Sequence, residues 1–195
     1  MILYSFFMSS CSWRVRVALR AKGIEYEYRP INLLTGEQRG EDFLRVNPMG
    51  QVPTLIDGDL LLTQSMAALE YLEELRPEPS LLPADRNQRA LVRQICEMIN
   101  AGLQPVQSGA DARLDAVGGQ GAGIAWGQEV NARGLAALEG VLAKTAGTCC
   151  VGDQLTFADC CLVPQVRRDV GLGLPMGRDS FVCYFAFFIN FVRTF

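Results

Sequence analysis

The stretch that decides the fold reads Ser9-Ser10-Cys11-Ser12-Trp13-Arg14-Val15-Arg16. A short apolar run at residues 1–7 precedes it and is typical of a strand. From Cys11 to Lys22 apolar residues recur at helical spacing, so this stretch is expected to join a strand to a helix. The free amides and the positive dipole end of such a helix favour an anion. The alternative interpretation is that Ser9 or Ser10 only caps the helix.

The composition excludes several classes of protein. The chain has 195 residues, a formal net charge of −3 and no histidine. The negative charge argues against a nucleic-acid partner, and the lack of histidine removes Ser-His and Cys-His triads and histidine-ligated metals. Seven cysteines without paired zinc spacing, and the lack of a secretion leader, predict reduced thiols in the cytoplasm and no metal site. The longest apolar run, residues 181–192, is too short to span a membrane easily.

The first part of the chain alternates strand and helix patterns. Gly23 is expected to stop the first helix, and residues 25–32 predict a second strand. A loop rich in glycine and charge follows at residues 35–41, and residues 42–46 predict a short helix.

Residues 54–62 predict a hairpin, because Asp57-Gly58 supports a type I′ turn. Residues 64–76 predict a helix whose inward face carries Ala68, Leu69, Leu72 and Leu75. The order is therefore β-α-β followed by β-β-α, which predicts a small mixed sheet with helices packed on it.

A proline-rich stretch divides the chain. We expect one domain at residues 1–77, a linker at 78–86 and an all-helical domain at 87–195. Residues 87–104 and 124–144 have helical spacing, and the first of these is expected to bury a stripe of Leu91, Ile95 and Met98.

The stretch from Thr156 to Val166 predicts one more helix. Thr156 and Asp159 match a capping box, and the residues that follow are almost wholly apolar. We therefore expect this helix to be buried.

Several short sequence motifs are similar to those of one family: Ser9–Arg16, Asn47-Pro48-Met49, Gln51–Leu55, Gln64-Ser65, Gly102–Pro105, Val151-Gly152-Asp153 and Leu162–Val166. The sequence that carries them resembles the zeta class of the glutathione transferases over residues 1–166. The resemblance implies a thioredoxin-like N-terminal domain followed by an all-helical C-terminal domain.

The resemblance also implies an activity. The characteristic reaction of the class is the glutathione-dependent cis–trans isomerisation of maleylacetoacetate to fumarylacetoacetate, a step in tyrosine and phenylalanine catabolism. Alternatives on the same scaffold are a maleylpyruvate isomerase and a conjugating or dehalogenating transferase. An alternative of another class is a non-catalytic glutathione-binding module. The partners expected are glutathione, a small cis-dicarboxylate substrate and a second copy of the chain in a homodimer.

The resemblance implies that Ser9, Ser10 and Cys11 are the catalytic residues. Ser9 is the residue expected to activate the glutathione thiol, and the hydroxyl and the helix terminus together can lower a thiol pKa toward neutrality. Cys11 either approaches the ligand sulfur or packs as a small apolar residue. The lack of Cys-x-x-Cys argues against a glutaredoxin-type redox centre.

Other positions match family residues that contact glutathione. Val52 is expected to present its backbone to the cysteinyl part of glutathione beside a cis Pro53. At the start of a helix, Gln64 and Ser65 are expected to hold the γ-glutamyl carboxylate, although capping is a compatible role. The remaining positions carried over by resemblance are Arg14, Gln38 and Gln104.

The sequence departs from the family at residues 167–195. Arg167 and Arg168 directly follow the last motif, Leu162–Val166. Their spacing does not reproduce the segment in which the family places a substrate-binding arginine. Residues 181–189 are apolar on every face. We therefore expect near-normal glutathione affinity, impaired turnover and a poorly packed C-terminus.

Replacing residues 167–195 with a family-type ending tests this expectation. Turnover and solubility are expected to rise together, measured by isomerase assay and by size-exclusion chromatography. Full activity and monodispersity in the unchanged chain would contradict it.

Overall fold

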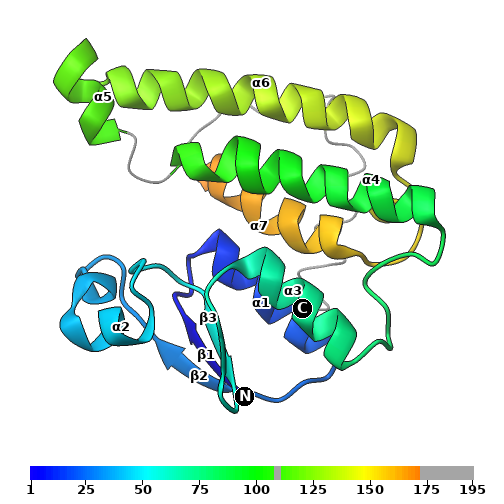
Figure 1. The fold of residues 1–195 in the computed structure, drawn as a ribbon. Helices are drawn as coiled ribbons and strands as arrows, with labels where there is room; N and C mark the ends of the chain where they lie inside the picture. The colour runs from blue at the N-terminus through cyan, green and yellow to red at the C-terminus, as the bar shows by residue number, and fades with distance from the viewer. Residues whose placement is uncertain (108–110, 172–195) are drawn as a thin grey trace. The chain divides into compact units, whose positions relative to one another are not determined.

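The structure is a computed structural model, and it describes residues 1–107 and 111–171 (Figure 1). The chain divides into two compact units, Met1–Leu81 and a second one that begins at Leu82. This division falls inside the stretch 78–86. Within the described residues, no helix combines the length and the apolar character needed to cross a membrane.

The first unit is built on a four-stranded sheet of order β2-β1-β3-β4. The strands are β1 (Ile2–Ser5), β2 (Glu27–Pro30), β3 (Thr54–Asp57) and β4 (Leu60–Leu62). β1 runs parallel to β2, whereas β3 runs antiparallel to both β1 and β4. β1 and β4 therefore end at the same end of the sheet, and β3 begins there. The predicted mixed sheet is confirmed.

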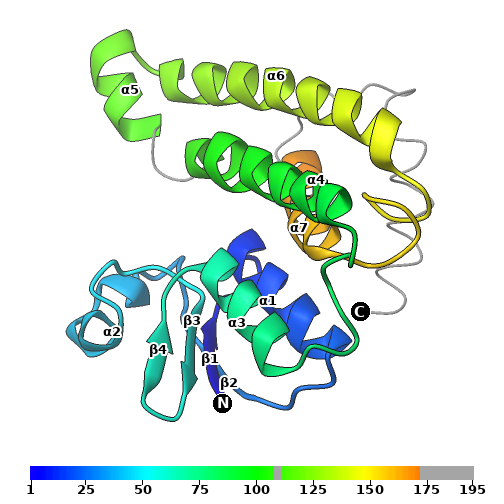
Figure 2. The same cartoon turned by 45° about the vertical axis from the view of Figure 1, so that its right-hand side comes forward.

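Helices cover both faces of this sheet. Figure 2 shows α1 (Ser10–Ala21) and α3 (Ser65–Leu75) together on one side, and α2 (Glu41–Val46) on the other. The ring of Tyr4 in β1 packs against that of Phe43 in α2, with centroids 5.6 Å apart. Because strand side chains alternate, the fully buried Leu3 faces the α1 and α3 side.

The end of α1 confirms the expected stop at Gly23. The Gly23 amide donates to the Arg20 carbonyl at 3.1 Å, and the Ile24 amide donates to the Leu19 carbonyl at 2.9 Å. This pair of bonds is the Schellman motif, and Gly23 adopts the positive φ of 59° that the motif requires.

Three details of the first unit differ from the predictions. The hairpin turn is centred on Gly58-Asp59, because Asp57 pairs with Leu60, and only Gly58 has a positive φ, which excludes type I′. The predicted loop at 35–41 contains a 3₁₀ turn at Glu37–Arg39. Leu75 is 49% exposed because it lies in the last turn of α3, beyond the buried Ala68, Leu69 and Leu72.

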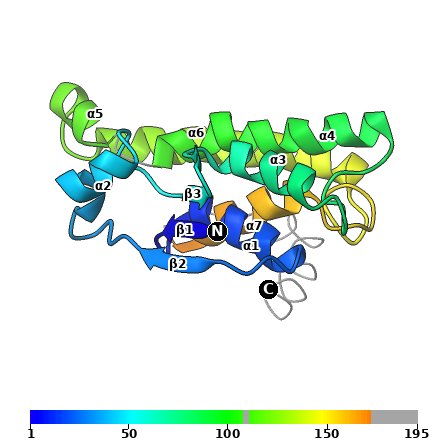
Figure 3. The ribbon, with the colours of Figure 1, turned by 60° about the horizontal axis from the view of Figure 1, so that its bottom comes forward.

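The described part of the second unit is helical apart from turns and one isolated bridge. Its elements are α4 (Arg86–Glu97), a π-helical segment η2 (Met98–Leu103), a 3₁₀ turn η3 (Gln104–Gln107), α5 (Asp111–Gly118), α6 (Ala122–Thr145) and α7 (Phe157–Gly171). The side chain of Asp85 caps α4, where it accepts from the Asn87 and Gln88 amides. Figures 1 and 2 show α4 and α6 running alongside each other, and the two overlap in the view of Figure 3.

The predicted stripe of Leu91, Ile95 and Met98 is partly wrong. Ile95 is fully buried, but Leu91 and Met98 are only partly buried. The inward face is centred on Val92, Ile95 and Ile99, so Leu91 and Met98 lie at its edge. The fully buried side chains of this segment are Val92, Ile95, Cys96, Ile99 and Leu103.

The start of α7 has half of the predicted capping box. The Asp159 carboxylate accepts from the Thr156 amide at 2.7 Å and from the Thr156 hydroxyl at 2.8 Å. It also accepts from the Cys150 amide at 2.7 Å, so it fixes the loop that precedes the helix. The helix is buried through Val166, as predicted. The apolar run at 181–189 lies outside the described residues.

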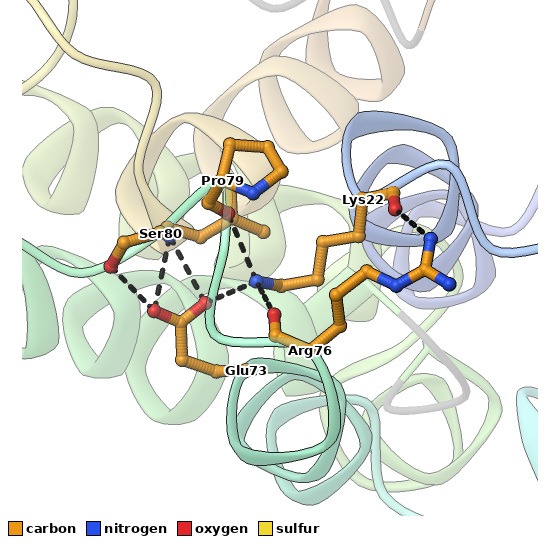
Figure 4. A network of polar contacts seen from close by, with 6 residues as sticks. Lys22, Glu73, Arg76, Pro79 and Ser80 are labelled. Atoms are coloured by element: carbon orange, nitrogen blue, oxygen red, sulfur yellow. Dashed lines mark hydrogen bonds and ion pairs between the residues drawn. The ribbon is translucent and has the colours of Figure 1, made fainter.

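A buried ion pair joins the C-terminal end of α1 to α3 (Figure 4). The fully buried Lys22 ammonium lies 2.7 Å from the Glu73 carboxylate and donates to the carbonyls of Arg76 and Pro79. Glu73 also accepts from the Ser80 hydroxyl at 2.6 Å. Burial raises the pKa of Glu73, but the bonds from Lys22, Ser80 and the Leu81 amide outweigh it, so the pKa lies below its ordinary value.

We predict that Lys22→Met lowers the free energy of unfolding by about 3–5 kcal/mol, because it leaves the Glu73 carboxylate in the network without its cation. Urea denaturation measures the effect. Arg45→Met is the matched control: Arg45 pairs with Glu41 and Asp42 on the surface, and its loss is expected to cost less than about 1 kcal/mol. Equal effects of the two changes would contradict the importance of the buried pair.

The network also predicts a pH dependence. A carboxyl whose pKa is lowered on folding contributes stability above its unfolded pKa and loses that stability as the pH falls through the lowered value. The wild-type protein is therefore expected to lose stability on acidification through this range. Glu73→Gln should make that part of the pH profile shallower.

Candidate functional site

Ser9 lies at the point where β1 gives way to α1. It has an extended backbone, with φ −72° and ψ 119°, and it is the N-cap of the helix. Its hydroxyl oxygen accepts the Ser12 amide hydrogen at 3.2 Å. A hydroxyl that accepts in this way still has its own hydrogen to donate. Capping is therefore observed, and it leaves Ser9 able to donate to an anion.

The neighbours of Ser9 differ in exposure. Ser10 is 5% exposed, whereas Cys11 is half-buried. Ser12 is fully buried, and no partner for its hydroxyl is found in the described part of the chain. Cys11 is a free thiol.

Arg14 connects the two helices that begin at this end of the sheet. It is fully buried, and its Nη1 donates to the Ser65 hydroxyl at 3.2 Å. Ser65 is the first residue of α3, and Gln64 is its N-cap. The contact therefore places a buried positive charge beside the start of α3 and ties it to α1.

The turn at residues 47–51 lies next to the start of α3. The Gln64 side-chain amide donates to the Met49 sulfur at 3.5 Å. Asn47 is fully buried and holds the turn: its side chain donates to the Gln51 carbonyl at 2.8 Å and accepts from the Met49 amide at 3.0 Å. The sequence from Asn47 to Thr54 predicts a turn followed by an extended step at Pro53, and the turn is confirmed by the Gly50 amide, which donates to the Asn47 carbonyl at 2.9 Å.

Val52 and Pro53 follow this turn and precede β3. The bond between them is cis, as predicted, and Glu78–Pro79 is a second cis bond that was not predicted. β3 begins at Thr54, which pairs with Tyr4. The Val52–Pro53 segment therefore lies at the end of the sheet where β1 leads to Ser9.

Gln38 lies against the same turn. An added Cβ at Gly50 would lie 2.8 Å from the Gln38 carbonyl oxygen, so the two backbones are in close approach. The Gln38 side-chain oxygen is buried, and within the described residues no donor reaches it. A ligand N–H group is the kind of partner that this oxygen lacks.

Gln104 belongs to the second unit, where it begins η3 directly after the π-helical segment. It is half-buried. Its contact with glutathione remains a prediction.

Within the first unit, the residues at this end of the sheet suit an anionic, peptide-like ligand. Two helices begin here, and neither α1 nor α3, both of which are fully described, has an acidic residue in its first turn. Their dipoles and the buried Arg14 therefore favour negative charge. Glutathione fits this chemistry, because it carries carboxylates, peptide N–H groups and a thiol. Among residues 1–107 and 111–171, no group of histidine, cysteine or acidic side chains is arranged to hold a metal ion.

Comparison with known proteins agrees with this chemistry. Residues 1–74 match the model of the glutathione S-transferase N-terminal domain. Maleylacetoacetate isomerase of Mus musculus is 52% identical over 170 residues, which are 86% of this chain and 77% of that protein. Glutathione S-transferase Z2 of Arabidopsis thaliana is 43% identical, over 85% of this chain and 74% of its own length.

Solved structures agree as well. A bacterial maleylpyruvate isomerase of the zeta class, described as a holo structure, has a TM-score of 0.89 and 33% identity, and covers 100% of this chain and 96% of its own. Maleylacetoacetate isomerase from Anaeromyxobacter dehalogenans, solved with glutathione bound, has a TM-score of 0.80 and 41% identity over 99% of this chain and 87% of its own. The chain belongs to the zeta class of the glutathione transferases, the family of the maleylacetoacetate isomerases.

The unpaired oxygen of Gln38 gives a prediction. Gln38→Leu is expected to weaken glutathione binding about 3- to 10-fold, the effect of one neutral hydrogen bond of about 1 kcal/mol. Without glutathione its stability should not fall, since the side-chain oxygen has no partner to lose. Calorimetric titration measures the binding, and Gln94→Leu on the exposed face of α4 is the control. Equal glutathione affinity in the two variants would remove Gln38 from the site.

Proposed function

We propose that this chain is a glutathione-dependent isomerase that converts maleylacetoacetate to fumarylacetoacetate. The observation that carries the proposal is Ser9: its hydroxyl caps α1 through its oxygen and keeps its hydrogen available at the positive end of the helix. The relative from Mus musculus, with 52% identity, is itself a maleylacetoacetate isomerase. Ser9 lies within residues 1–74, which match the family's N-terminal domain.

The energy required of this site is modest. To bring a free thiol with a pKa of about 8.5 near neutrality takes roughly 2 kcal/mol of thiolate stabilisation. A hydrogen bond to a charged acceptor contributes about 1.5–3 kcal/mol. The helix terminus adds about 0.3–1 kcal/mol. The Ser9 hydroxyl and the start of α1 therefore suffice, and no histidine is needed.

The chain's other residues hold and orient the cofactor. In this proposal the amides at the start of α3 and the Ser65 hydroxyl bind the γ-glutamyl carboxylate, with the buried Arg14 behind them. The main chain of Val52 pairs with the cysteinyl backbone, and Gln38, Gln64 and Gln104 supply polar side chains. Ser10 and Cys11 line the start of α1 beside Ser9.

When bound, glutathione supplies a nucleophilic thiolate, and the reaction regenerates it. Ser9 holds the thiol in its ionised form by donating its hydroxyl hydrogen to the sulfur. Its own position is fixed by the Ser12 amide. The chain thus performs nucleophilic catalysis without a nucleophilic side chain of its own.

The proposal also covers the location, the oligomeric state, the pathway and the exact substrate of the protein. Family resemblance supports a cytoplasmic homodimer that acts in tyrosine and phenylalanine catabolism. A second candidate substrate is maleylpyruvate, which the likeness to the maleylpyruvate isomerase structure favours. Turnover of the two substrates by the same preparation decides between them.

Ser9→Ala tests the role of Ser9. The pKa of the bound glutathione thiol is expected to rise by about one to two units, because the hydroxyl bond of about 1.5–3 kcal/mol is lost. Stability is expected to fall by about 1 kcal/mol through loss of the cap. Ultraviolet titration of the thiolate and an isomerase assay measure the two consequences for function.

Ser12→Ala is the matched control for this experiment. Its hydroxyl has no partner among the described residues, so its removal should leave both the thiol pKa and turnover close to wild type. If Ser9→Ala behaves like Ser12→Ala in the titration, Ser9 is only a helix cap. A protein in which the thiol titrates as in free glutathione is instead a non-catalytic binding module.

A further inference from the structure

The turn between β1 and α1 places Ser9, and its two central residues have little packing of their own. It spans Phe6 to Ser9 and is closed by the Ser9 amide, which donates to the Phe6 carbonyl at 3.0 Å. Its two central residues, Phe7 and Met8, are 68% and 58% exposed. The Phe7 ring touches that of Phe6, with centroids 4.9 Å apart. Phe6 itself is buried against Phe43 and Val52, so hydrogen bonds must supply most of the order in the part of the turn that follows it.

Arg16 supplies those bonds. Its Nη1 donates to the Ser5 hydroxyl at 2.8 Å and to the Phe6 carbonyl at 3.1 Å, and its Nη2 donates to the Phe7 carbonyl at 3.0 Å. Helical side chains lean toward the N-terminus, so a residue in the second turn of α1 can reach back to the segment that precedes the helix. The planar guanidinium donates to adjacent acceptors at the same time, which an ammonium group does with less order.

We propose that Arg16 is a positioning residue for the isomerase reaction, because it fixes the turn that presents the Ser9 hydroxyl. The Phe6 carbonyl accepts from both Arg16 and the Ser9 amide, so the guanidinium and Ser9 share one acceptor. Ser5, whose hydroxyl accepts from Arg16, is fully buried in β1. Arg16 thereby connects the rigid strand, the exposed turn and the helix. The inference rests on the proposed role of Ser9.

The test compares Arg16→Met and Arg16→Lys with Arg20→Met and Arg20→Lys. Arg20 lies on the same helix, is exposed and makes no contact with the turn in the described structure, so its variants control for the loss of charge. Arg16→Met is expected to raise the pKa of the bound glutathione thiol by about one unit and to lower kcat about 10- to 100-fold. Arg16→Lys should change the thiol pKa and kcat less than Arg16→Met does, since lysine keeps the positive charge but lacks the planar guanidinium.

A second ligand separates positioning from general damage. S-methylglutathione has no ionisable thiol, so its affinity reports the other contacts of the site. We expect it to change by less than about threefold in the Arg16 variants, because kcat and not ground-state binding is affected. Where Arg16→Met does not fold, Arg16→Lys decides the question.

Two outcomes would overturn the proposal. One is a thiol pKa and kcat in the folded Arg16 variants that equal those of the Arg20 variants. The other is an equal loss of affinity for glutathione and S-methylglutathione with no change in the thiol pKa, which is a structural effect only. A wild-type protein without isomerase activity would instead refute the proposed function, and the thiol titration would still decide the role of Arg16.

Discussion

The direction of the strands is the constraint on which the site depends. Because β1 and β4 both run antiparallel to β3, the helices that follow them begin at the same end of the sheet. β3 starts at that end too, so the cis Val52–Pro53 segment lies there. Two positive helix ends, an extended backbone and the buried Arg14 thus meet around one location. A small mixed sheet thus provides a site for an anionic peptide without any histidine.

The second constraint is that polar side chains fix the irregular segments between these elements. Asn47 holds the turn before Pro53, Arg14 ties α1 to the first residue of α3, and Arg16 clamps the turn before Ser9. Lys22 and Glu73 do the same at the other end of α1. These side chains bind backbone or hydroxyl groups of the irregular segments, so the rigidity of the site comes from hydrogen bonds as well as from the apolar core.

The sequence predicted the features that depend on neighbouring residues. Short local patterns indicated the Ser9 cap and the stop at Gly23, whereas the cis Pro53 was predicted from the family resemblance. It could not predict contacts between distant residues, such as the one from Arg14 to Ser65, or the clamp by Arg16 on the strand before it. The predicted helix face was off at Leu91 and Met98, because each stands beside another apolar residue, Val92 or Ile99, and the 3.6-residue pattern alone did not show which of the two is buried.

The most direct test of the account is turnover of maleylacetoacetate by the unmodified chain with glutathione, with S-methylglutathione and with neither. The account predicts isomerisation with glutathione alone, because only its thiol can be ionised beside Ser9. Equal turnover in all three conditions would contradict it, since the chain would then be catalysing the reaction with its own side chains.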